Sequence, residues 1–588
     1  MRRLYTAAAA LLVGAAAIAQ NINPTVEVTN TYQGDPSEVQ KPAQKMNVPD
    51  SLLRFDMDFD YEVFEKPYQG AYRFKPYQLN MRPDKDAYRG RSIYLKAGAG
   101  YSFHPQLDFV FSPEQRGPFQ MSVYATHKSY FGKYNSFGSS FESDHWRYDS
   151  TLGSYNGYDA LTTAGFEGRY NWDKAIASFR VGYYGVMAKD TLSKRAYNGF
   201  DFNARLRANH SESSYFHYDA SLDGRIGNDR LDYPSYAFYR PGRSDIREGW
   251  FRLKGEFGPQ LNYFHRILVG LEAETASYGG DLFDGNAGRI AVIPKYEFET
   301  GRWNLSLGLR IEKLSHSGQS DTTLFRPMHT KKGRTLYPEI KVGFTAADNI
   351  LLYANLTGGS SLNAYCQQLA YNHHFSPLYA FEGPLMDNSV ERYNLQVGVK
   401  GNLGSRLQFD VNGGAAGVEN GLVDDAYYLL SLPQVGYADY SLIYANALLG
   451  LKAGNFDFDA SARFRKMTFD DESVTAFKMP LFSGNFRAVY HFGQRVYAGT
   501  VVEVASSRER SVALPAPGYY SGTVFDSQPM VSAVLPGYVD LGLVAGWQLN
   551  RRLGLWAEAG NLLCDNVQRN LFHVEKDLWI TAGITLNL

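Results

Sequence analysis

The segment LWITAGITLNL, residues 578–588, carries the clearest structural signal in the chain. Its alternate residues from Leu578 to Leu588 are all apolar, and most residues between them are polar or small. A side-chain period of two is that of a β-strand. The same alternation runs through 539–548 and 553–560. Soluble strands average about 5 to 6 residues, whereas a tilted membrane-spanning strand needs about 9 to 11. The three strands therefore predict an all-β fold, a transmembrane antiparallel β-barrel.

The composition agrees with a barrel. The chain has 588 residues, of which 15% are aromatic, with 43 Tyr and 37 Phe. Tyr at this level suits the aromatic girdles of a membrane barrel. No apolar run of about 18 residues follows the N-terminus, which excludes spanning helices. The formal net charge of −1 gives no reason to expect a nucleic-acid partner.

The N-terminal part is expected to differ from the rest. Residues 1–19 have two arginines, an apolar core and a small-residue cleavage site, as in a secretory signal peptide. Residues 20–91 are rich in Pro and lack sustained alternation, so we expect a periplasmic or lumen-associated segment. Residues 92–588 form the barrel. The two cysteines, Cys366 and Cys564, exclude a disulfide framework. Export and membrane-length strands predict the outer membrane of a Gram-negative cell.

Charged residues alternate with apolar ones along several strands, as in 200–208, 218–226 and 456–465. Charge of both signs is costly toward lipid, so we expect these residues to line a hydrated lumen. Two readings stay open: a ligand-selective lining, or Arg–Asp ladders that neutralise one another and stabilise the wall. The lining candidates are Arg205, Arg207, Asp219, Asp223, Arg225, Asp457, Asp459, Arg463 and Arg465.

Short and long connections alternate along the chain. Ten short turns are predicted near 104–106, 172–174, 212–214, 259–261, 300–302, 347–349, 404–405, 453–455, 493–494 and 550–551. Longer irregular connections are predicted around 132–158, 226–248, 315–334, 358–390, 418–438 and 506–535. Short periplasmic turns and long extracellular loops then give about 22 strands, or about 16 to 20 if some early hairpins lie outside the barrel. A membrane sheet cannot keep a free edge, so residues 93–101 should pair with 578–588.

The C-terminal half resembles the TonB-dependent receptors of Gram-negative outer membranes. The resemblance rests on 389–401 (SVERYNLQVGVKG), 407–410 (LQFD), 557–563 (AEAGNLL) and 582–588 (AGITLNL). It implies transport of a solute across the outer membrane, extracellular loops that bind the ligand, and an energy-coupling partner protein.

Two features near the N-terminus bear on the resemblance. The family has a large N-terminal plug domain, and the short, Pro-rich segment 20–91 predicts a truncated or absent plug. The segment Thr25-Val26-Glu27-Val28-Thr29 is similar to the energy-coupling box of these receptors. If the plug is missing, a structural or accessory barrel in an outer-membrane complex, with a surface lipoprotein or other envelope proteins as partners, is the alternative. A passive porin is the third reading.

The sequence holds few residues that could form a catalytic or metal site. His373 and His374 are adjacent, so in an extended segment they point to opposite sides, and no spaced third ligand lies nearby. Ser360 and Ser361 lack the strand-to-helix context of a nucleophile elbow. No phosphate-binding or dinucleotide motif is present. The sequence therefore predicts no catalytic residue, no metal site and no cofactor, and a protein that is not an enzyme.

The long connection 358–390 holds a group of aromatic residues. Their rings are candidates for docking a ligand or a partner, because aromatic side chains are good interface anchors. Packing of the loop on itself over the barrel mouth is the equal alternative. The residues are Tyr365, Tyr371, Phe375, Tyr379 and Phe381.

Overall fold

The structure is a computed structural model that describes residues 92–588, except 102, 114–117, 143–144, 173, 192, 209–215, 233–242, 263, 281–284, 319–333, 348, 376–377, 380–382, 385, 405, 428–431 and 514–529. The chain divides into the units Met1–Val63 and Phe64–Leu588, and every described residue belongs to the second. The expected signal peptide, the segment 20–91 and the coupling-box candidates 25–29 lie outside the described residues. None of the helices in the described part of the chain is long and apolar enough to cross a membrane.

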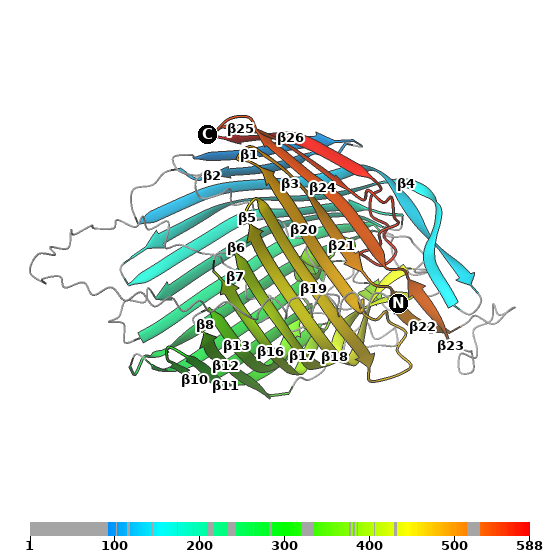
Figure 1. The fold of residues 1–588 in the computed structure, drawn as a ribbon. Helices are drawn as coiled ribbons and strands as arrows, with labels where there is room; N and C mark the ends of the chain where they lie inside the picture. Colours follow the sequence, from blue (N-terminus) through cyan, green and yellow to red (C-terminus); the bar gives the residue numbers. More distant parts are fainter. Residues whose placement is uncertain are drawn as a thin grey trace, which may run out of the picture. The chain divides into compact units, whose positions relative to one another are not determined.

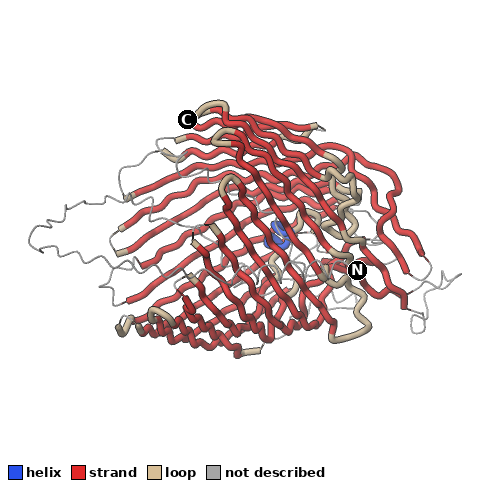
Figure 2. The backbone as a smooth tube through the Cα atoms, in the orientation of Figure 1, coloured by secondary structure: helices blue, strands red, loops and turns tan. Residues whose placement is uncertain are grey.

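Strands dominate the described residues, with one helix, α4 (Tyr365–Tyr371), marked in blue in Figure 2. The first strands are β1 (Ile93–Gly100), β2 (Gln106–Phe111), β3 (Phe119–Glu142), β4 (His145–Asn171), β5 (Ala175–Lys189), β6 (Lys194–Ala208), β7 (Phe216–Asp232), β8 (Arg243–Pro259), β9 (His265–Gly280), β10 (Gly285–Glu299), β11 (Trp303–Gly318), β12 (Leu336–Ala347) and β13 (Ile350–Leu362). The remaining strands are β14 (Leu378–Tyr379), β15 (Gly383–Pro384), β16 (Asn388–Leu403), β17 (Leu407–Tyr427), β18 (Leu432–Ala453), β19 (Phe456–Phe469), β20 (Phe482–Phe492), β21 (Val496–Ala505), β22 (Arg508–Ala513), β23 (Met530–Leu535), β24 (Tyr538–Gln548), β25 (Leu553–Gly560) and β26 (Trp579–Asn587).

Twenty-two of the described strands close into one barrel. Strands β14 and β15 form a small sheet of their own, and β22 and β23 form a hairpin between β21 and β24, which pair directly with each other. All other strands follow each other as antiparallel neighbours (Figure 1). Strand β1 pairs with β26, from Tyr94 opposite Asn587 to Gly100 opposite Thr581. The predicted strand number and the predicted closing pair are both confirmed.

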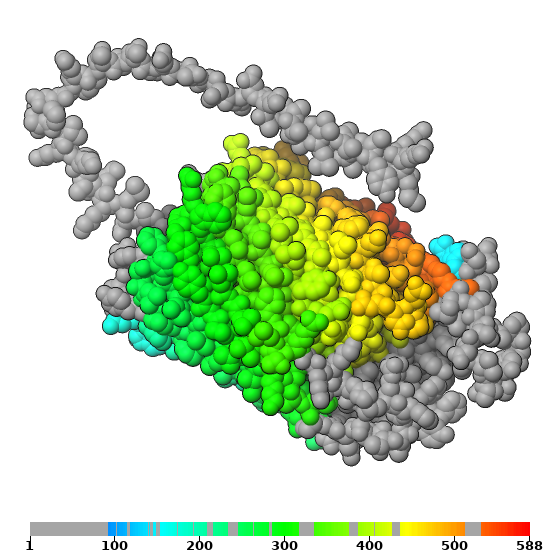
Figure 3. All heavy atoms as spheres, turned by 90° about the horizontal axis from the view of Figure 1, so that it is seen from below, coloured from blue at the N-terminus to red at the C-terminus, as the bar shows by residue number. Residues whose placement is uncertain are grey.

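The two faces of the wall differ as predicted. Large apolar side chains such as Phe200, Ile226 and Ile290 are more than half exposed. The residues that follow or precede them in the strand, such as Asp201 and Arg225, point the other way and form an ion pair with each other. Figure 3 shows the outer surface, where the colours pass from green to orange in chain order across neighbouring strands. An apolar outside and a charged, paired inside are the properties of an outer-membrane barrel, which locates this protein in the outer membrane.

The strand order assigns each connection to one of two ends of the barrel. Ten connections lie at the same end as Ser92 and Leu588: those after β2, β4, β6, β8, β10, β12, β16, β18, β20 and β24. The turn predicted at 104–106 is wrong in this respect, because the β1–β2 connection lies at the opposite end. Its place is taken by the β2–β3 connection, where the Asn171 N–H donates to the Pro118 carbonyl. Because β1 and β2 are short, only the turn at Pro105 was recognised in the sequence, and the β2–β3 connection was not.

Three of the tight turns at this end depend on glycine. Gly404, Gly454 and Gly493 have φ of 62°, 62° and 68°. This left-handed conformation suits Gly, because a side chain would clash with the backbone there. The glycines in 404–405, 453–455 and 493–494 therefore gave correct turn predictions.

The opposite end is more regular than predicted. Two of the connections expected to be irregular are mostly extended ribbons in their described residues, because β3 and β4 run to Glu142 and from His145, and β17 and β18 to Tyr427 and from Leu432. The expected loop 506–535 contains β22 and β23, and β23 pairs in parallel with β4. A small apolar cluster joins these ribbons to the loops beside them, with Tyr148, Phe477, Ala533, Leu535, Leu571 and Phe572 at its centre.

Candidate functional site

Residues 363–375 fold back onto the inner face of the barrel. Tyr365 and Leu369 on α4 are fully buried against a cluster that includes Val186, Tyr197 and Ile246 from β5, β6 and β8. Burying two such side chains contributes about 1.5 to 3 kcal/mol each. The helix is only two turns long and has no side-chain N-cap, so packing against the wall holds it in place rather than its own propensity.

Buried charges fix the same segment. Arg195 on β6 donates to Asp229 at 2.9 Å, to the Tyr365 hydroxyl at 3.1 Å and to the carbonyls of His373 and Phe375 at 2.7 and 2.5 Å. The Tyr365 hydroxyl donates to Asp229. Burial raises the pKa of Tyr365 far above its usual range, so the hydroxyl stays a donor. A single guanidinium thus links two strands to the folded-back segment.

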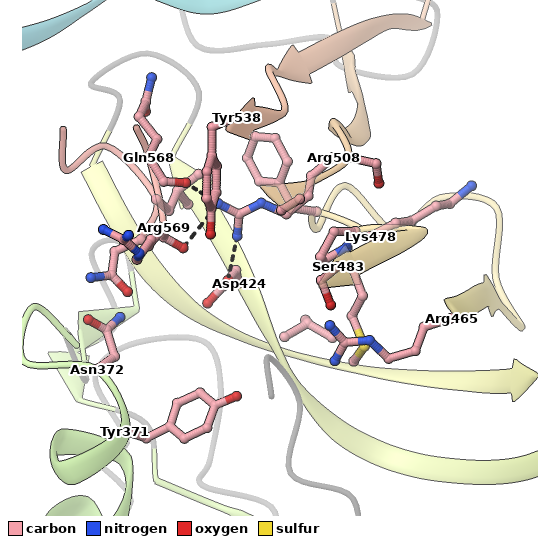
Figure 4. Close-up of a pocket in the computed structure, with 18 of the residues that line it drawn as sticks. Tyr371, Asn372, Asp424, Arg465, Lys478, Ser483, Arg508, Tyr538, Gln568 and Arg569 are labelled. Carbon is pink, nitrogen blue, oxygen red and sulfur yellow. Dashed lines mark hydrogen bonds and ion pairs between the residues drawn. The ribbon is translucent and has the colours of Figure 1, made fainter. Parts of the chain in front are cut away.

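The aromatic candidates have different environments. Tyr365 is buried and serves the packing of the segment, and Phe375 is half-buried with its ring 6.1 Å from that of Tyr365. Tyr371 is half-buried and borders a cleft (Figure 4). Tyr379 lies in β14, and Phe381 is outside the described residues. For Tyr365, packing of the loop is what the structure shows.

Several predicted lining residues form ion pairs across neighbouring strands. Arg205 contacts Asp219 at 2.7 Å, Arg252 contacts Asp223 at 3.1 Å, and Arg225 contacts Asp201. Arg207 is opposite Asp219 in the β6–β7 register. On β19, Asp457 lies 3.0 Å from His491 and Asp459 lies 3.6 Å from Arg487.

The largest charged network was missed by the sequence reasoning. It lies on β9 to β12, where Arg289 contacts Glu272 at 3.3 Å and Glu274 at 3.1 Å, and Arg310 contacts Glu272 at 2.8 Å. The signal was present, because Glu272 and Glu274, like Arg310 and Glu312, are charged residues two apart in an alternating strand. We call the inner face of β5 to β12, with its ion pairs, the paired wall.

A cleft of about 130 Å³, open to solvent, lies between residues 368–375, the inner face of β17 to β21, and the loops 470–480 and 561–578. We call this inner face the cleft wall. Basic groups outnumber acidic ones around the cleft, five to two. The charged lining residues are Arg463, Arg465, Lys478, Arg508, Arg569, Asp424 and Glu503. Figure 4 shows Arg465, Lys478, Arg508 and Arg569 around the cavity.

Two of these arginines have acidic partners. Arg569 donates to Glu503 at 3.0 Å and to Asp540 at 2.5 Å, and Arg508 donates to Asp424 at 3.4 Å. Burial by itself would lower the pKa of Arg569, but Glu503, Glu575 and Tyr538 together outweigh burial and raise that pKa well above its usual range. Both acidic residues of the cleft are therefore engaged by these two arginines.

Arg465 differs from them. The residue is 6% exposed, and its Nε and Nη1 have no hydrogen-bond partner. Among the described residues no carboxylate lies within ion-pair distance of it. A buried cation without a partner is costly unless a counter-charge arrives. The cleft wall therefore presents an uncompensated positive charge at Arg465.

The loop 561–578 owes its shape to the Asn561 that begins it. This residue has φ of 47°, and its side chain donates to the carbonyl of Asp565 at 2.9 Å and accepts from the Asp565 N–H at 3.0 Å. Its own N–H donates to Asp540 at 2.9 Å. Asn tolerates left-handed backbone better than most residues, because its short polar side chain bonds locally. Asn561, which lies in the segment 557–563 quoted above, thus begins the loop that positions Gln568 and Arg569 beside the cleft.

Comparison with known proteins places the fold. No protein-family model matches the chain, and neither does any curated protein. Among solved structures, the ferripyoverdine receptor of the Pseudomonas aeruginosa outer membrane matches with a TM-score of 0.59 and 13% identity, over 84% of this chain and 71% of its own. The fold is that of the TonB-dependent receptors.

Two further structures agree. The copper transporter OprC matches with a TM-score of 0.57 and 14% identity, over 85% of this chain and 80% of its own. The siderophore receptor PiuA from Acinetobacter baumannii matches with a TM-score of 0.58 and 10% identity, over 85% and 82%. At these identities the similarity concerns the barrel architecture, and the named ligands belong to those proteins.

Proposed function

We propose that this outer-membrane barrel is a receptor that binds a negatively charged solute in the cleft and passes it across the outer membrane. The observation that carries the proposal is Arg465, a buried guanidinium without a partner in a cleft where basic groups prevail. An anion with carboxylate or phosphate groups would accept charge-assisted hydrogen bonds from it. The receptors and transporters that share the fold support the same class of function.

In this proposal the end of the barrel with ten short turns faces the periplasm, and the cleft opens toward the cell exterior. Segment 20–91 controls the lumen, and residues 25–29 contact an energy-coupling protein. The barrel wall, with its apolar outer face, is anchored in outer-membrane lipids. An enzymatic role has no support in the fold, since the structures that share it are receptors and transporters.

Binding is tested with citrate and inorganic phosphate as anionic probes, by isothermal titration calorimetry of the full-length protein in detergent. Arg465→Met removes the charge and keeps most of the side-chain volume. We expect it to weaken binding about ten- to a hundredfold, because a hydrogen bond to a charged group contributes about 1.5 to 3 kcal/mol. Arg465→Lys should restore part of the affinity. Arg205→Met is the matched control, since Arg205 lies on the paired wall.

Equal binding of both anions by the wild type and Arg465→Met would contradict the proposed role of the cleft. Transport is then tested separately, by single-channel conductance of the full-length protein and of a form lacking residues 20–91 in planar bilayers. Conductance of the truncated form alone supports gated transport. If neither form conducts, the accessory-barrel reading replaces transport, and copurification with envelope proteins becomes the decisive measurement. If both conduct equally, the porin reading replaces it.

A further inference from the structure

Three side chains from distant parts of the sequence meet beside the cleft. Asp190 lies in the β5–β6 connection, His374 follows α4, and His573 lies in the loop 561–578. One ligand atom from each lies within 4.8 Å of the other two. The two imidazole rings stack with centroids 3.6 Å apart and an interplanar angle of 21°, and His374 Nδ1 is 3.7 Å from an Asp190 carboxylate oxygen.

One of these groups lacks the partner that its burial demands. His573 is 2% exposed, and its Nδ1 has no hydrogen-bond partner. Buried polar atoms are nearly always paired, and leaving one unpaired costs about 1 to 3 kcal/mol. The unpaired nitrogen belongs to a ring that already faces a second imidazole and a carboxylate. A cation bound to this nitrogen would give it a partner.

The other two groups are held in position by their neighbours. Asp190 accepts from the Ser193 N–H at 2.5 Å and from the Ser193 hydroxyl at 3.2 Å. The backbone N–H of His374 donates to the Asn372 side chain at 2.9 Å. Such supporting hydrogen bonds orient the ligands of metal sites. The Asp190 carboxylate and the backbone at His374 are therefore positioned without a metal ion.

Further acidic groups lie near the cluster. Next to the cluster His373 forms a 3.0 Å hydrogen bond with Asp159, which directs the two adjacent histidines to different carboxylates. Burial and then His374 lower the pKa of His573 and keep its imidazole neutral, the form that binds a metal, whereas Glu575 and Asp159 act electrostatically in the opposite direction. The acidic groups near the two imidazoles can thus compensate part of the charge of a divalent ion.

We propose that Asp190, His374 and His573 bind a divalent transition-metal ion of the Zn²⁺ type. Two imidazoles and one carboxylate are a ligand set for Zn²⁺ and similar ions, whereas Mg²⁺ and Ca²⁺ prefer oxygen ligands alone. Three protein ligands leave a fourth position for water. The ion would join three separate segments, and because His374 also borders the cleft, it would fix one side of the cleft. The metal site does not depend on the proposed transport function.

This site was not predicted from the sequence. His373 and His374 were set aside because no third ligand lay nearby in the chain. Barrel closure brings the loop before the last strand next to the β5–β6 connection, so Asp190 and His573 come close to His374 only in the folded chain.

The test uses the full-length protein in detergent, stripped with EDTA and dialysed into Mg²⁺ buffer, with Zn²⁺ added by isothermal titration calorimetry. We expect one high-affinity Zn²⁺ site that Mg²⁺ does not occupy. His573→Gln, which keeps the size of the side chain, and His374→Ala should each weaken Zn²⁺ binding more than about tenfold. His316→Ala is the matched control, because His316 on β11 also has ring nitrogens without hydrogen bonds and has no metal-binding neighbours among the described residues.

A second measurement separates loss of the site from loss of the fold. Co²⁺ in place of Zn²⁺ should give visible absorption bands in the wild type and in His316→Ala, and not in His573→Gln or His374→Ala. Heat-modifiable mobility on electrophoresis reports whether each variant keeps a closed barrel. Unchanged Zn²⁺ affinity in folded His573→Gln and His374→Ala, or absence of Zn²⁺ binding by the wild type, overturns the proposal.

Discussion

The paired wall and the cleft wall are built from the same kind of strand, yet they use their charges differently. On the paired wall Arg195, Arg225, Arg252, Arg289 and Arg310 each contact at least one carboxylate. On the cleft wall Arg465 contacts none among the described residues. On the paired wall, Arg195 forms an ion pair with Asp229 and holds the segment 363–375 against the strands. The unpaired charge of Arg465 is, in our proposal, available to bind an anionic ligand. The structural reading of the charged lining fits the ion pairs of the paired wall, and the ligand-binding reading is our proposal for Arg465 on the cleft wall.

The largest effect is expected where the paired wall holds the segment 363–375. Arg195→Ala leaves the carboxylate of Asp229, which is fully buried, without its cation. Breaking a buried pair in this way costs about 3 to 5 kcal/mol. We expect hydrogen exchange of residues 363–375, measured by mass spectrometry, to rise strongly while the strands stay protected. Unchanged exchange there would show that packing of Tyr365 and Leu369 alone holds the segment. It would contradict the structural role assigned to the ion pairs of the paired wall.

A smaller effect is expected on the cleft side when pH falls. Burial, with His374 next in importance, lowers the pKa of His573 from 6.5 to about 4. Below pH 6.5 the imidazole of His573 is protonated when the loop is open and stays neutral when the loop is closed. The closed loop therefore loses stability as the pH falls from 6.5 to about 4. Charged groups facing His573 are Asp190, Asp159 and Glu575, and the pKa of Asp190 is about 2, held down by His374 against the effect of its burial.

Hydrogen exchange of residues 561–578 in EDTA measures this change, after correction for the intrinsic exchange rate. The population of the opened loop should rise by up to about tenfold per pH unit, as expected for uptake of one proton. His573→Gln should remove most of the pH dependence. A wild-type loop whose opening is independent of pH in this window would contradict a buried neutral His573.

The smallest effect is expected for an exposed pair of the paired wall. The Arg205 side chain is 47% exposed, and its bond to Asp219 is screened by solvent. Arg205→Ala should change the free energy of unfolding by less than about 1 kcal/mol in urea titration in detergent. A loss of unfolding free energy as large as that expected for Arg195→Ala would mean that exposed and buried ion pairs of the paired wall stabilise the barrel equally.

The architecture followed from the sequence because it depends on local periodicity. Alternation at Phe200 to Ala208 fixes which residues face outward, and glycines such as Gly454 mark the turns. The prediction was wrong where short strands hid a turn, as between β2 and β3, and where extended ribbons such as β22 and β23 looked irregular. Sequence patterns report the conformation of neighbouring residues, and these errors concern pairing between strands.

The site was less predictable for a physical reason. Arg465 was recognised as a lining candidate, but the absence of a partner depends on which strands flank it. Arg195 and His573 carried no signal, because their partners Asp229, Tyr365 and His374 come from other strands and loops. Buried charges and cross-loop contacts are properties of the tertiary structure, and one sequence does not display them.

Closure of β1 on β26 also constrains how the barrel is made. Tyr94 has to find Asn587, so the contact that removes the last sheet edges has almost the greatest sequence separation in the described chain. Such non-local pairings form slowly, and open edges invite pairing with other chains. The nascent protein therefore carries two unpaired edges until β26 is available, and it depends on protection of those edges between export and insertion.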